Sequence, residues 1–367
     1  MFYLCITLTM TLEHQPLEQK KYDLMFIWTP DTADRINAVK NRLVETLWED
    51  IQVYIQPYKQ FADGSWNVDL KNSVRGQHVY LYMDHFSDYS ENGVNPDINS
   101  RYMLTTHLID AIRNSSPKTL NVIFPMFPYG RSDKTEDMWI SNEPKRTPIM
   151  AARVAKDLWT ENIDYCITID LHNPSIVWFF KAYNTRCINL WYWWLIKKAI
   201  SMAGDIDNAE WWSTDLWWAK KSGKVRSKLH MNSFVGDKTR DYTIPNSVSE
   251  IEIHKWKAKI TWKHTKTYDD MFDTWGTAEK YSEELVHHEP ESNDMMMTHL
   301  LANWGWVWII KSLHEKGKLR RFYTTDSVYR ALAMPECVVR IPTDEIIAKT
   351  IESIVLKRPI QYNYTDE

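Results

Sequence analysis

Cysteine is scarce in this chain of 367 residues. The four cysteines are far apart and form no paired spacing of the kind that binds a metal, at Cys5, Cys166, Cys187 and Cys337. This pattern excludes a disulfide framework and gives no indication of a zinc site. The usage fits a reducing compartment, so we expect a cytoplasmic protein.

Long apolar runs are also missing. The first twelve residues, MFYLCITLTMTL, are apolar, but they lack a basic leader and are too short to span a bilayer. We interpret them as an extension or an edge strand, with a degenerate targeting segment as the alternative. No other apolar run approaches membrane length, so we expect no membrane partner.

Neither sign of charge dominates. A formal net charge of -4 argues against general nucleic-acid binding, although it permits a local basic pocket. The chain is 44% hydrophobic and 25% charged, which places it among globular rather than disordered proteins. Its length is large for one hydrophobic core, so two domains are the expectation.

The chain does contain a regular alternation of short strand-like and helix-like segments. Strand patterns at LMFIW, VRGQHVYLYM and TLNVIFPMF alternate with apolar residues at helical spacing from Asp31 to Asp50 and from Ser100 to Ile112. This order predicts an α/β fold with mostly parallel sheets. The second half, which begins near Trp191, repeats the design. There we expect a basic helix over residues 216–230 and a charged loop over SFVGDKTRDYT.

The most informative stretch is KAKITWKHTKTYDDMFDTWGT, from Lys257 to Thr277. Its alternation up to Tyr268 predicts a strand, followed by two acids and a polar turn that leads into a helix. Backbone NH groups at such a helix start, together with threonine hydroxyls, can bind a phosphate. The carboxylates can accept hydrogen bonds from sugar hydroxyls. An ordinary solvated turn is the alternative.

The segment DDMFDTWGT resembles the phosphoribosyl-binding loop of type I phosphoribosyltransferases, whose usual form is DD-x-x-DTGGT. Further short motifs occur in the order and at roughly the spacing found in ribose-phosphate pyrophosphokinases: FADGS, VRG, FPYGRSDK, KRTPI, ITIDLH, STD and GDKTR. The resemblance extends from about Leu47 to Ile354. A run of weak motifs in the right order is more specific than any one of them.

This resemblance implies two tandem type I phosphoribosyltransferase-like domains. Residues 20–190 would carry the ATP-side motifs, and residues 191–367 the ribose 5-phosphate loop and a last helix that can pack on the first domain. The implied enzyme is a ribose-phosphate diphosphokinase, which transfers diphosphate from ATP to the anomeric hydroxyl of ribose 5-phosphate and releases AMP. The implied cofactor is Mg²⁺, and the implied assembly is a homo-oligomer, a dimer or a hexamer.

The ATP-binding residues follow from two matches. Asp63, Gly64 and Ser65 match a family segment, usually FxDGE, that holds adenine from a neighbouring subunit, with serine in place of glutamate. Arg131 and Ser132 match an Arg-Gln pair that contacts ATP. Judged locally, the first group is equally compatible with a hairpin turn and Arg131 with a solvated loop charge.

The metal positions implied by the resemblance are His172, at the magnesium and ATP site, and Asp215. Mg²⁺ prefers oxygen ligands, so Asp215 is chemically the stronger candidate. A histidine at the end of a strand is otherwise a structural hydrogen-bonding group. Lys238 and Arg240 match the Lys-x-Arg of a mobile catalytic loop, where two cations would stabilise charge in the transition state. Without the resemblance they form a surface charge cluster.

The sugar-binding residues implied by the resemblance lie in the segment DDMFDTWGT. Asp269 and Asp270 are expected to hold the ribose hydroxyls. The 5-phosphate would be held by the turn that follows, which contains Asp273, Thr274, Gly276 and Thr277.

Tryptophan replaces glycine at several of these ligand turns. Trp275 stands where the family loop has its first glycine, and Trp217 and Trp218 follow Asp215 where the family has two glycines. An indole fills space and disfavours a positive backbone φ. Two hypotheses remain open: an active synthetase, and a nucleotide-binding regulatory or structural subunit with weak or no catalysis. A phosphoribosyltransferase that consumes the product would not explain the ATP motifs.

Overall fold

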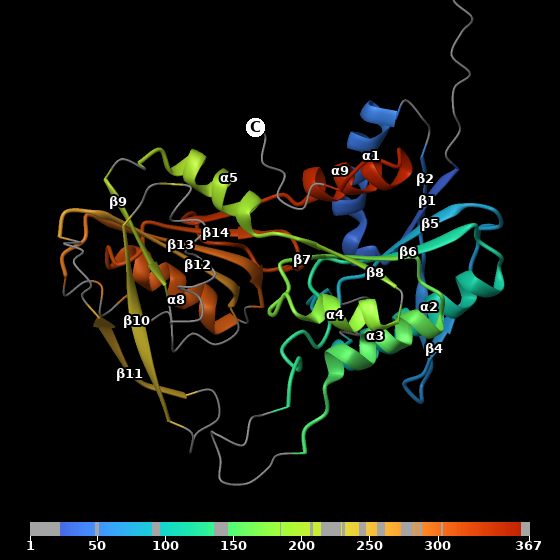
Figure 1. Cartoon of the computed structure of the whole chain (residues 1–367), viewed down its shortest axis with the longest axis horizontal. Coiled ribbons are helices and arrows are strands. Elements are labelled where there is room, and N and C mark those ends of the chain that lie inside the picture. The colour runs from blue at the N-terminus through green and yellow to red at the C-terminus, as the bar shows by residue number, and fades with distance from the viewer. Residues whose placement is uncertain are drawn as a thin grey trace, which may run out of the picture.

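In the residues that it describes, the computed structural model has two large β-sheets with helices packed on their faces, and a separate two-stranded hairpin (Figure 1). It describes residues 23–47, 51–89, 96–135, 146–183, 185–205, 208–213, 229, 232–241, 247–254, 261–272, 282, 285, 288–301 and 304–360. For residues 213, 232–241, 247–254, 272, 304 and 306 it describes the backbone alone.

The first sheet has six parallel strands in the order β2-β1-β5-β6-β7-β8. Their bounds are β1 (Leu24–Trp28), β2 (Gln52–Ile55), β5 (His78–Tyr82), β6 (Thr119–Phe124), β7 (Tyr165–Ile169) and β8 (Arg186–Leu190). A separate antiparallel hairpin consists of β3 (Tyr58–Gln60) and β4 (Trp66–Val68). Parallel strands need crossover connections, and helices supply most of them here.

Helices cover both faces of the first sheet. The helices associated with this sheet are η1 (Pro30–Thr32), α1 (Ala33–Leu47), α2 (Ile98–Asn114), α3 (Met150–Thr160), α4 (Ile176–Ala182) and α9 (Asp344–Val355). Successive residues of β1 enter different cores: Phe26 packs with α1 and α9, whereas Met25 packs with α2, α3 and α4. A strand buried on both faces reads as a continuous apolar run, which is why LMFIW is entirely hydrophobic.

The second sheet has seven strands in the order β11-β10-β9-β12-β13-β14-β15. All neighbours are parallel except β10 and β11, which are antiparallel. The bounds are β9 (Ala209–Ser213), β10 (Asn232–Asp241), β11 (Ser247–His254), β12 (His264–Phe272), β13 (Ser292–Leu300), β14 (Arg321–Thr325) and β15 (Val338–Ile341).

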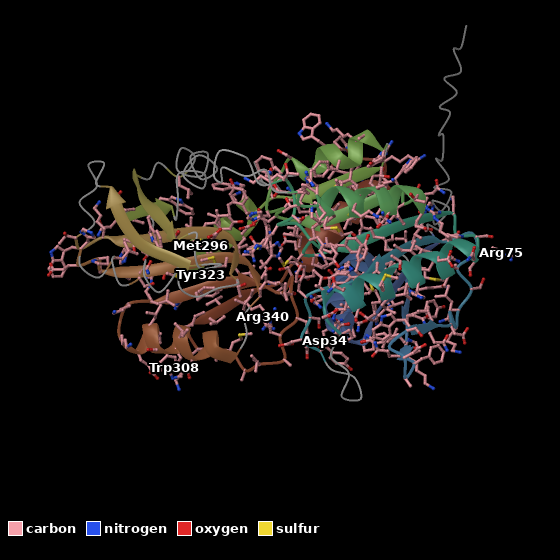
Figure 2. All side chains as sticks on the ribbon, turned by 90° about the horizontal axis from the view of Figure 1, so that it is seen from below. Asp34, Arg75, Met296, Trp308, Tyr323 and Arg340 are labelled. Carbon is pink, nitrogen blue, oxygen red and sulfur yellow. The ribbon has the colours of Figure 1, made fainter. Side chains whose placement is uncertain are left out.

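Two helices pack on opposite faces of the second sheet, α5 (Trp193–Ala203) and α8 (Trp304–Glu315). Met296 and Tyr323 belong to the core on the α5 side, and this core is continuous with that beneath α1 and α9. Trp308 lies on the outer side of α8, away from those two residues, and is 69% exposed (Figure 2). The shared core therefore holds the two sheets in a fixed relation.

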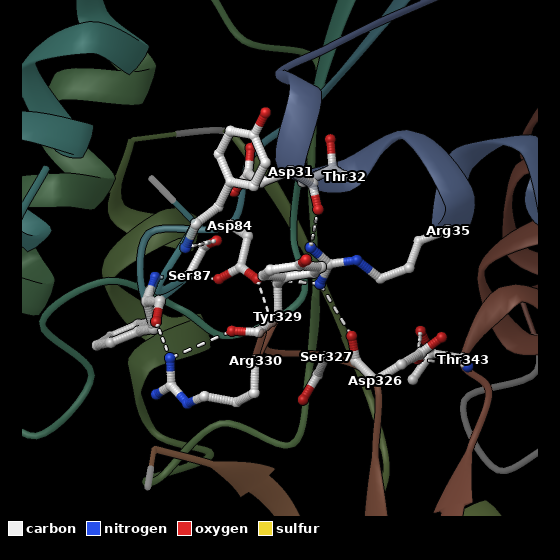
Figure 3. A network of polar contacts seen from close by, with 12 residues as sticks. Asp31, Thr32, Arg35, Asp84, Ser87, Asp326, Ser327, Tyr329, Arg330 and Thr343 are labelled. Carbon is white, nitrogen blue, oxygen red and sulfur yellow. Dashed lines mark hydrogen bonds and ion pairs between the residues drawn. The ribbon is translucent and has the colours of Figure 1, made fainter. Parts of the chain in front are cut away.

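A buried ionic cluster also connects the sheets (Figure 3). We call it the charged joint and define it as Asp31, Arg35, Asp84, Asp326 and Thr343. The Arg35 guanidinium donates to an Asp84 carboxylate oxygen at 3.0 Å, to the Asp326 carbonyl at 2.9 Å and to the Asp31 carbonyl at 3.2 Å. The Asp326 carboxylate accepts the Thr343 backbone NH at 2.8 Å. These bonds compensate charges that burial would otherwise destabilise.

Two sequence predictions are corrected by the second sheet. The charged loop predicted over SFVGDKTRDYT is wrong, because residues 232–241 form β10, next to the edge strand β11. Charged residues are common on strands near a sheet edge, so charge alone does not indicate a loop. The strand predicted to end at Tyr268 instead continues to Phe272, because Asp269 and Met271 pair with β13. The predicted basic helix lies outside the described residues, apart from Leu229.

In the part of the chain that the structure describes, no helix combines the length and the apolar composition needed to cross a membrane.

Candidate functional site

The two sheets meet where β7 ends and β12 carries its acidic pair. His172 follows β7 by three residues, and Asp270 lies within β12. The His172 Nδ1 and Asp270 Oδ2 atoms are 2.7 Å apart. Asp270 is buried, whereas the His172 side chain is 37% exposed. This contact, between residues 98 positions apart, brings together a predicted ATP-side residue and a predicted sugar-side residue.

The protonation of His172 follows from this contact. Burial favours the neutral imidazole, but the hydrogen bond to Asp270 and its negative charge outweigh burial and raise the pKa of His172. Asp133 acts in the same direction and Arg131 in the opposite one. His172 therefore holds a proton to higher pH than an ordinary histidine.

A second set of contacts lies directly beneath this pair. We call it the polar joint and define it as Asp170, Tyr268, Thr298, His299 and Ser327. The Asp170 carboxylate accepts hydrogen bonds from the Tyr268 hydroxyl and, at 2.7 Å, from the Thr298 hydroxyl. Asp170 precedes His172 by two residues, and Tyr268 precedes Asp270 by two. The polar joint therefore fixes the backbone on both sides of the His172–Asp270 contact.

His299 completes the polar joint from β13. Its Nε2 lies 3.0 Å from the Ile169 carbonyl oxygen, and its Nδ1 lies 2.8 Å from the Ser327 hydroxyl. Burial lowers the pKa of His299, so the ring is neutral. A carbonyl oxygen can only accept, so Nε2 carries the hydrogen and Nδ1 accepts from Ser327. This histidine connects the end of β7 to Ser327, which follows β14 by two residues.

The loop that carries Arg131 and Ser132 also reaches this region. The Asn173 amide, next to His172, donates to Asp133 at 2.5 Å. The Ser132 hydroxyl donates to the Pro148 carbonyl at 2.9 Å and accepts the Met150 backbone NH at 3.1 Å. Ser132 thus caps the start of α3, and the exposed Arg131 stands close enough to influence His172 electrostatically.

The Asp63 turn is placed elsewhere. The Asp63 carboxylate accepts the Ser65 backbone NH at 2.9 Å and the Ser65 hydroxyl at 2.6 Å, and these bonds lower the pKa of Asp63. Gly64 has φ +86°, a conformation that favours glycine in this hairpin turn. Figure 1 shows the β3–β4 hairpin on the side of the molecule away from the second sheet. Within one chain this hairpin therefore lies apart from β12, which carries Asp269 and Asp270.

Several predicted site residues lie outside the described residues: Asp215, Trp217, Trp218, Asp273, Thr274, Trp275, Gly276 and Thr277. For Lys238 and Arg240 the structure gives the backbone alone, in β10. Asp269 is half-buried in β12, where its carboxylate accepts the Asp270 backbone NH at 2.9 Å.

Tyr268, Thr298 and His299 were not among the predicted site residues. They lie in β12 and β13, where polar residues within apolar strands were the available signal. Asp170 occurs in the motif ITIDLH but was given no role there. Its partners are 98 and 128 positions away, so local patterning could not reveal them.

The described residues provide only part of a metal site. Among them, no three histidine, cysteine, aspartate or glutamate side chains converge on one metal position. Mg²⁺ is often held by one or two carboxylates together with water and substrate phosphate oxygens. The acids of β12 fit a site of that kind but do not form a complete cage.

The comparisons with known proteins agree with this arrangement. A family model described as the N-terminal domain of ribose phosphate pyrophosphokinase matches residues 33–160. Ribose-phosphate pyrophosphokinase 2 of Saccharomyces cerevisiae is 26% identical, over 83% of this chain and 88% of the relative. Ribose-phosphate pyrophosphokinase 4 of the same yeast is 29% identical, over 83% of this chain and 86% of the relative.

A solved structure supports the fold. The crystal structure of phosphoribosylpyrophosphate synthetase from Mycobacterium smegmatis has a TM-score of 0.73 and 22% identity, and the match covers 91% of this chain and 99% of that one. The predicted α/β fold with mostly parallel, phosphoribosyltransferase-like sheets is confirmed. The resemblance indicated by the motifs is confirmed as well: along most of its length, the chain is similar to ribose-phosphate pyrophosphokinases.

Proposed function

We propose that this protein is a ribose-phosphate diphosphokinase that uses ATP, ribose 5-phosphate and Mg²⁺. The observation that carries the proposal is the 2.7 Å contact between His172, from an ATP-side motif, and Asp270, from a sugar-side motif. Transfer of diphosphate requires both substrates in one place. A site at the meeting of two sheets, fixed by the polar joint, meets that requirement.

On the sugar side, we assign the ribose hydroxyls to Asp269 and Asp270. Carboxylates at the end of a parallel strand lie where ligands commonly bind in α/β sheets. The 5-phosphate is assigned to Asp273, Thr274, Gly276 and Thr277, which follow β12 in the sequence. In a turn of the kind that the resemblance implies, backbone NH groups and threonine hydroxyls would donate the hydrogen bonds that a phosphate dianion accepts.

On the nucleotide side, we assign His172 to the magnesium and ATP site and Asp215 to the second metal position. Asp270 raises the pKa of His172 and so favours the imidazolium, which can bind a phosphate oxygen of ATP. Bound Mg²⁺ would neutralise charge on the diphosphate. Arg131 and Ser132 lie on the neighbouring loop and are assigned to ATP contacts.

Lys238 and Arg240 are assigned to stabilisation of the charge that builds on the diphosphate during transfer. Both belong to β10, so a strand of the second sheet, rather than a loop, carries them. Cations positioned where charge develops in the transition state are effective in this role. Lys238→Ala should therefore lower turnover with little loss of ATP affinity, and comparable losses of both would contradict the assignment.

The remote Asp63 turn bears on assembly. If Asp63, Gly64 and Ser65 hold adenine, we expect them to do so for a neighbouring copy, because the β3–β4 hairpin that carries them lies on the side away from the second sheet (Figure 1). We therefore propose a homo-oligomer, a dimer or a hexamer, built from domains 20–190 and 191–367.

The cytoplasm is the proposed location of the protein. Three described cysteines are free and buried, which is compatible with a reducing compartment.

The experiment is AMP release from ATP and Mg²⁺, measured with and without ribose 5-phosphate. We expect AMP formation that depends on the sugar phosphate. Folded protein that binds ATP but releases no sugar-dependent AMP would overturn the proposal and favour a nucleotide-binding subunit.

A nucleotide-binding subunit with weak or no catalysis is the second candidate function, because tryptophans occupy positions where the family has glycine. Trp275→Gly should raise activity or sugar affinity if the indole crowds the phosphate. An unchanged or lower value would mean that the native turn accommodates the side chain.

A further inference from the structure

Two of the free cysteines lie side by side in the first sheet, outside the proposed active site. Cys166 of β7 is the register partner of Cys187 of β8. Both side chains belong to the core on the side of α2, α3 and α4, so they leave the sheet on the same face. Burial, and after it the neighbouring Cys187 thiol, raises the pKa of the Cys166 thiol. The strand register and the shared core place the two side chains next to each other in the folded protein.

The two thiols differ in their access to small molecules. Cys166 is fully buried, whereas Cys187 borders a cavity of about 840 Å³. Lys181 and Arg186 line the same cavity, and the Lys181 ammonium lies 4.2 Å from the centre of the Trp178 ring. Because Cys187 borders this cavity, a small oxidant can reach its thiol first, and Cys166 lies beside it on the neighbouring strand.

The backbone geometry permits a disulfide between them. Neighbouring strands are about 4.8 Å apart, which falls within the Cα separation of about 4.4–6.8 Å found across disulfides. The Cβ atoms must approach more closely than the strand spacing. Strand β8 is the edge strand of its sheet and pairs with β7 alone among the described strands, so it can shift toward β7. A disulfide that needs such a shift is strained and easily reduced.

We propose that Cys166 and Cys187 form a reversible redox pair that a hydroperoxide converts into a cross-strand disulfide. The Cys187 thiolate attacks the O–O bond of hydrogen peroxide, which gives a sulfenic acid and, after proton uptake, water. The Cys166 sulfur then attacks the Cys187 sulfur. The S–S bond forms, the S–O bond breaks, and the departing hydroxide takes the Cys166 proton as a second water. In sum, two thiols and one peroxide give one disulfide and two waters.

The test uses the full-length, reduced protein in its native state. It is exposed to hydrogen peroxide, unfolded in the presence of an alkylating reagent, and digested for peptide mass analysis. We expect a linked pair of peptides that contains Cys166 and Cys187, lighter by two hydrogen atoms than the two free peptides. Dithiothreitol should restore two alkylatable thiols.

The chain supplies its own control in Cys337. This cysteine is also free and buried, at 3% exposed, but it belongs to a different core cluster. It should remain alkylatable after the same treatment. In Cys166→Ser, the Cys187 sulfenic acid should persist and react with dimedone, because its resolving thiol is gone. The wild-type measurement stands even if this variant does not fold.

Two results would overturn the inference. One is that both thiols remain fully alkylatable at peroxide exposures that oxidise free glutathione completely. The other is that Cys166 or Cys187 links only to another cysteine, such as Cys337 of the different core cluster.

Discussion

The charged joint and the His172–Asp270 contact of the candidate site both connect the two sheets, but they differ in their exposure to solvent. In the charged joint, Arg35 and Asp84 are 8% and 1% exposed, and each carries a full charge that the other compensates. At the candidate site, buried Asp270 contacts a histidine side chain that is 37% exposed. A pair in which both side chains are buried has a structural role. A pair in which one side chain is exposed to solvent can contact a ligand.

The charged joint should give the largest effect on stability. Asp84→Asn leaves the Arg35 guanidinium buried without its carboxylate, a change that typically costs about 3–5 kcal/mol. We expect a loss of that size in urea unfolding. Activity per folded molecule should stay within a few-fold of wild type. A large loss of turnover in fully folded Asp84→Asn would remove the distinction between the two clusters.

The site should respond in the opposite way. Asp270→Asn removes both the proposed sugar contact and the negative partner of His172, so sugar-dependent AMP release should fall by about 10²-fold or more. Stability should change less than in Asp84→Asn, because His172 can become neutral at little cost. Steady-state kinetics and urea unfolding of the same preparation measure both effects. Normal turnover in this variant would contradict the site assignment.

The pH dependence should differ as well. Asp270 raises the pKa of His172, so the contact contributes stability below the ordinary histidine value of about 6.5 and loses it as pH rises through the raised pKa. If the imidazolium binds phosphate, kcat/KM should fall over the same upper range. His172→Gln should lack that alkaline limb. An identical limb in the variant would assign the titration to another group.

The smallest effect is expected in the polar joint. Tyr268→Phe removes one donor to the Asp170 carboxylate, but the Thr298 hydroxyl still donates at 2.7 Å. The expected loss in unfolding free energy is about 1 kcal/mol. The matched control is Tyr82→Phe, because the Tyr82 hydroxyl is buried with no hydrogen-bond partner among the described residues. Equal losses in both variants would mean that the Tyr268 bond contributes nothing specific.

Much of the first half of the fold could be predicted from periodicity. The apolar run at β1 and the helical spacing in α1 and α2 are local signals, and the structure has elements there. Prediction failed at β10, where charged residues suggested a loop. At β12 the strand was predicted but its end was not, because the pairing of Asp269 and Met271 with β13 leaves no local signal. Nor does the pattern indicate that Lys266, in the same strand, is fully buried between Asp205 and Asp294 at 2.7 and 2.8 Å. Such compensation between distant residues leaves no mark in a local pattern.

The site was predictable in its chemistry but not in its geometry. Motif resemblance selected His172 and Asp270 separately, and the structure places them in contact. Neither motif indicates that Tyr268 reaches Asp170, because this contact depends on how the two sheets are placed by their shared core. Resemblance also gave no reason to notice Cys166 opposite Cys187, which follows from strand register alone.

The most direct test of the central claim is a crystal structure of the protein with ribose 5-phosphate and a non-hydrolysable ATP analogue. The account predicts the sugar hydroxyls within hydrogen-bond distance of Asp269 and Asp270, and the nucleotide phosphates beside His172. Ligands bound away from the place where β7 and β12 meet would contradict it.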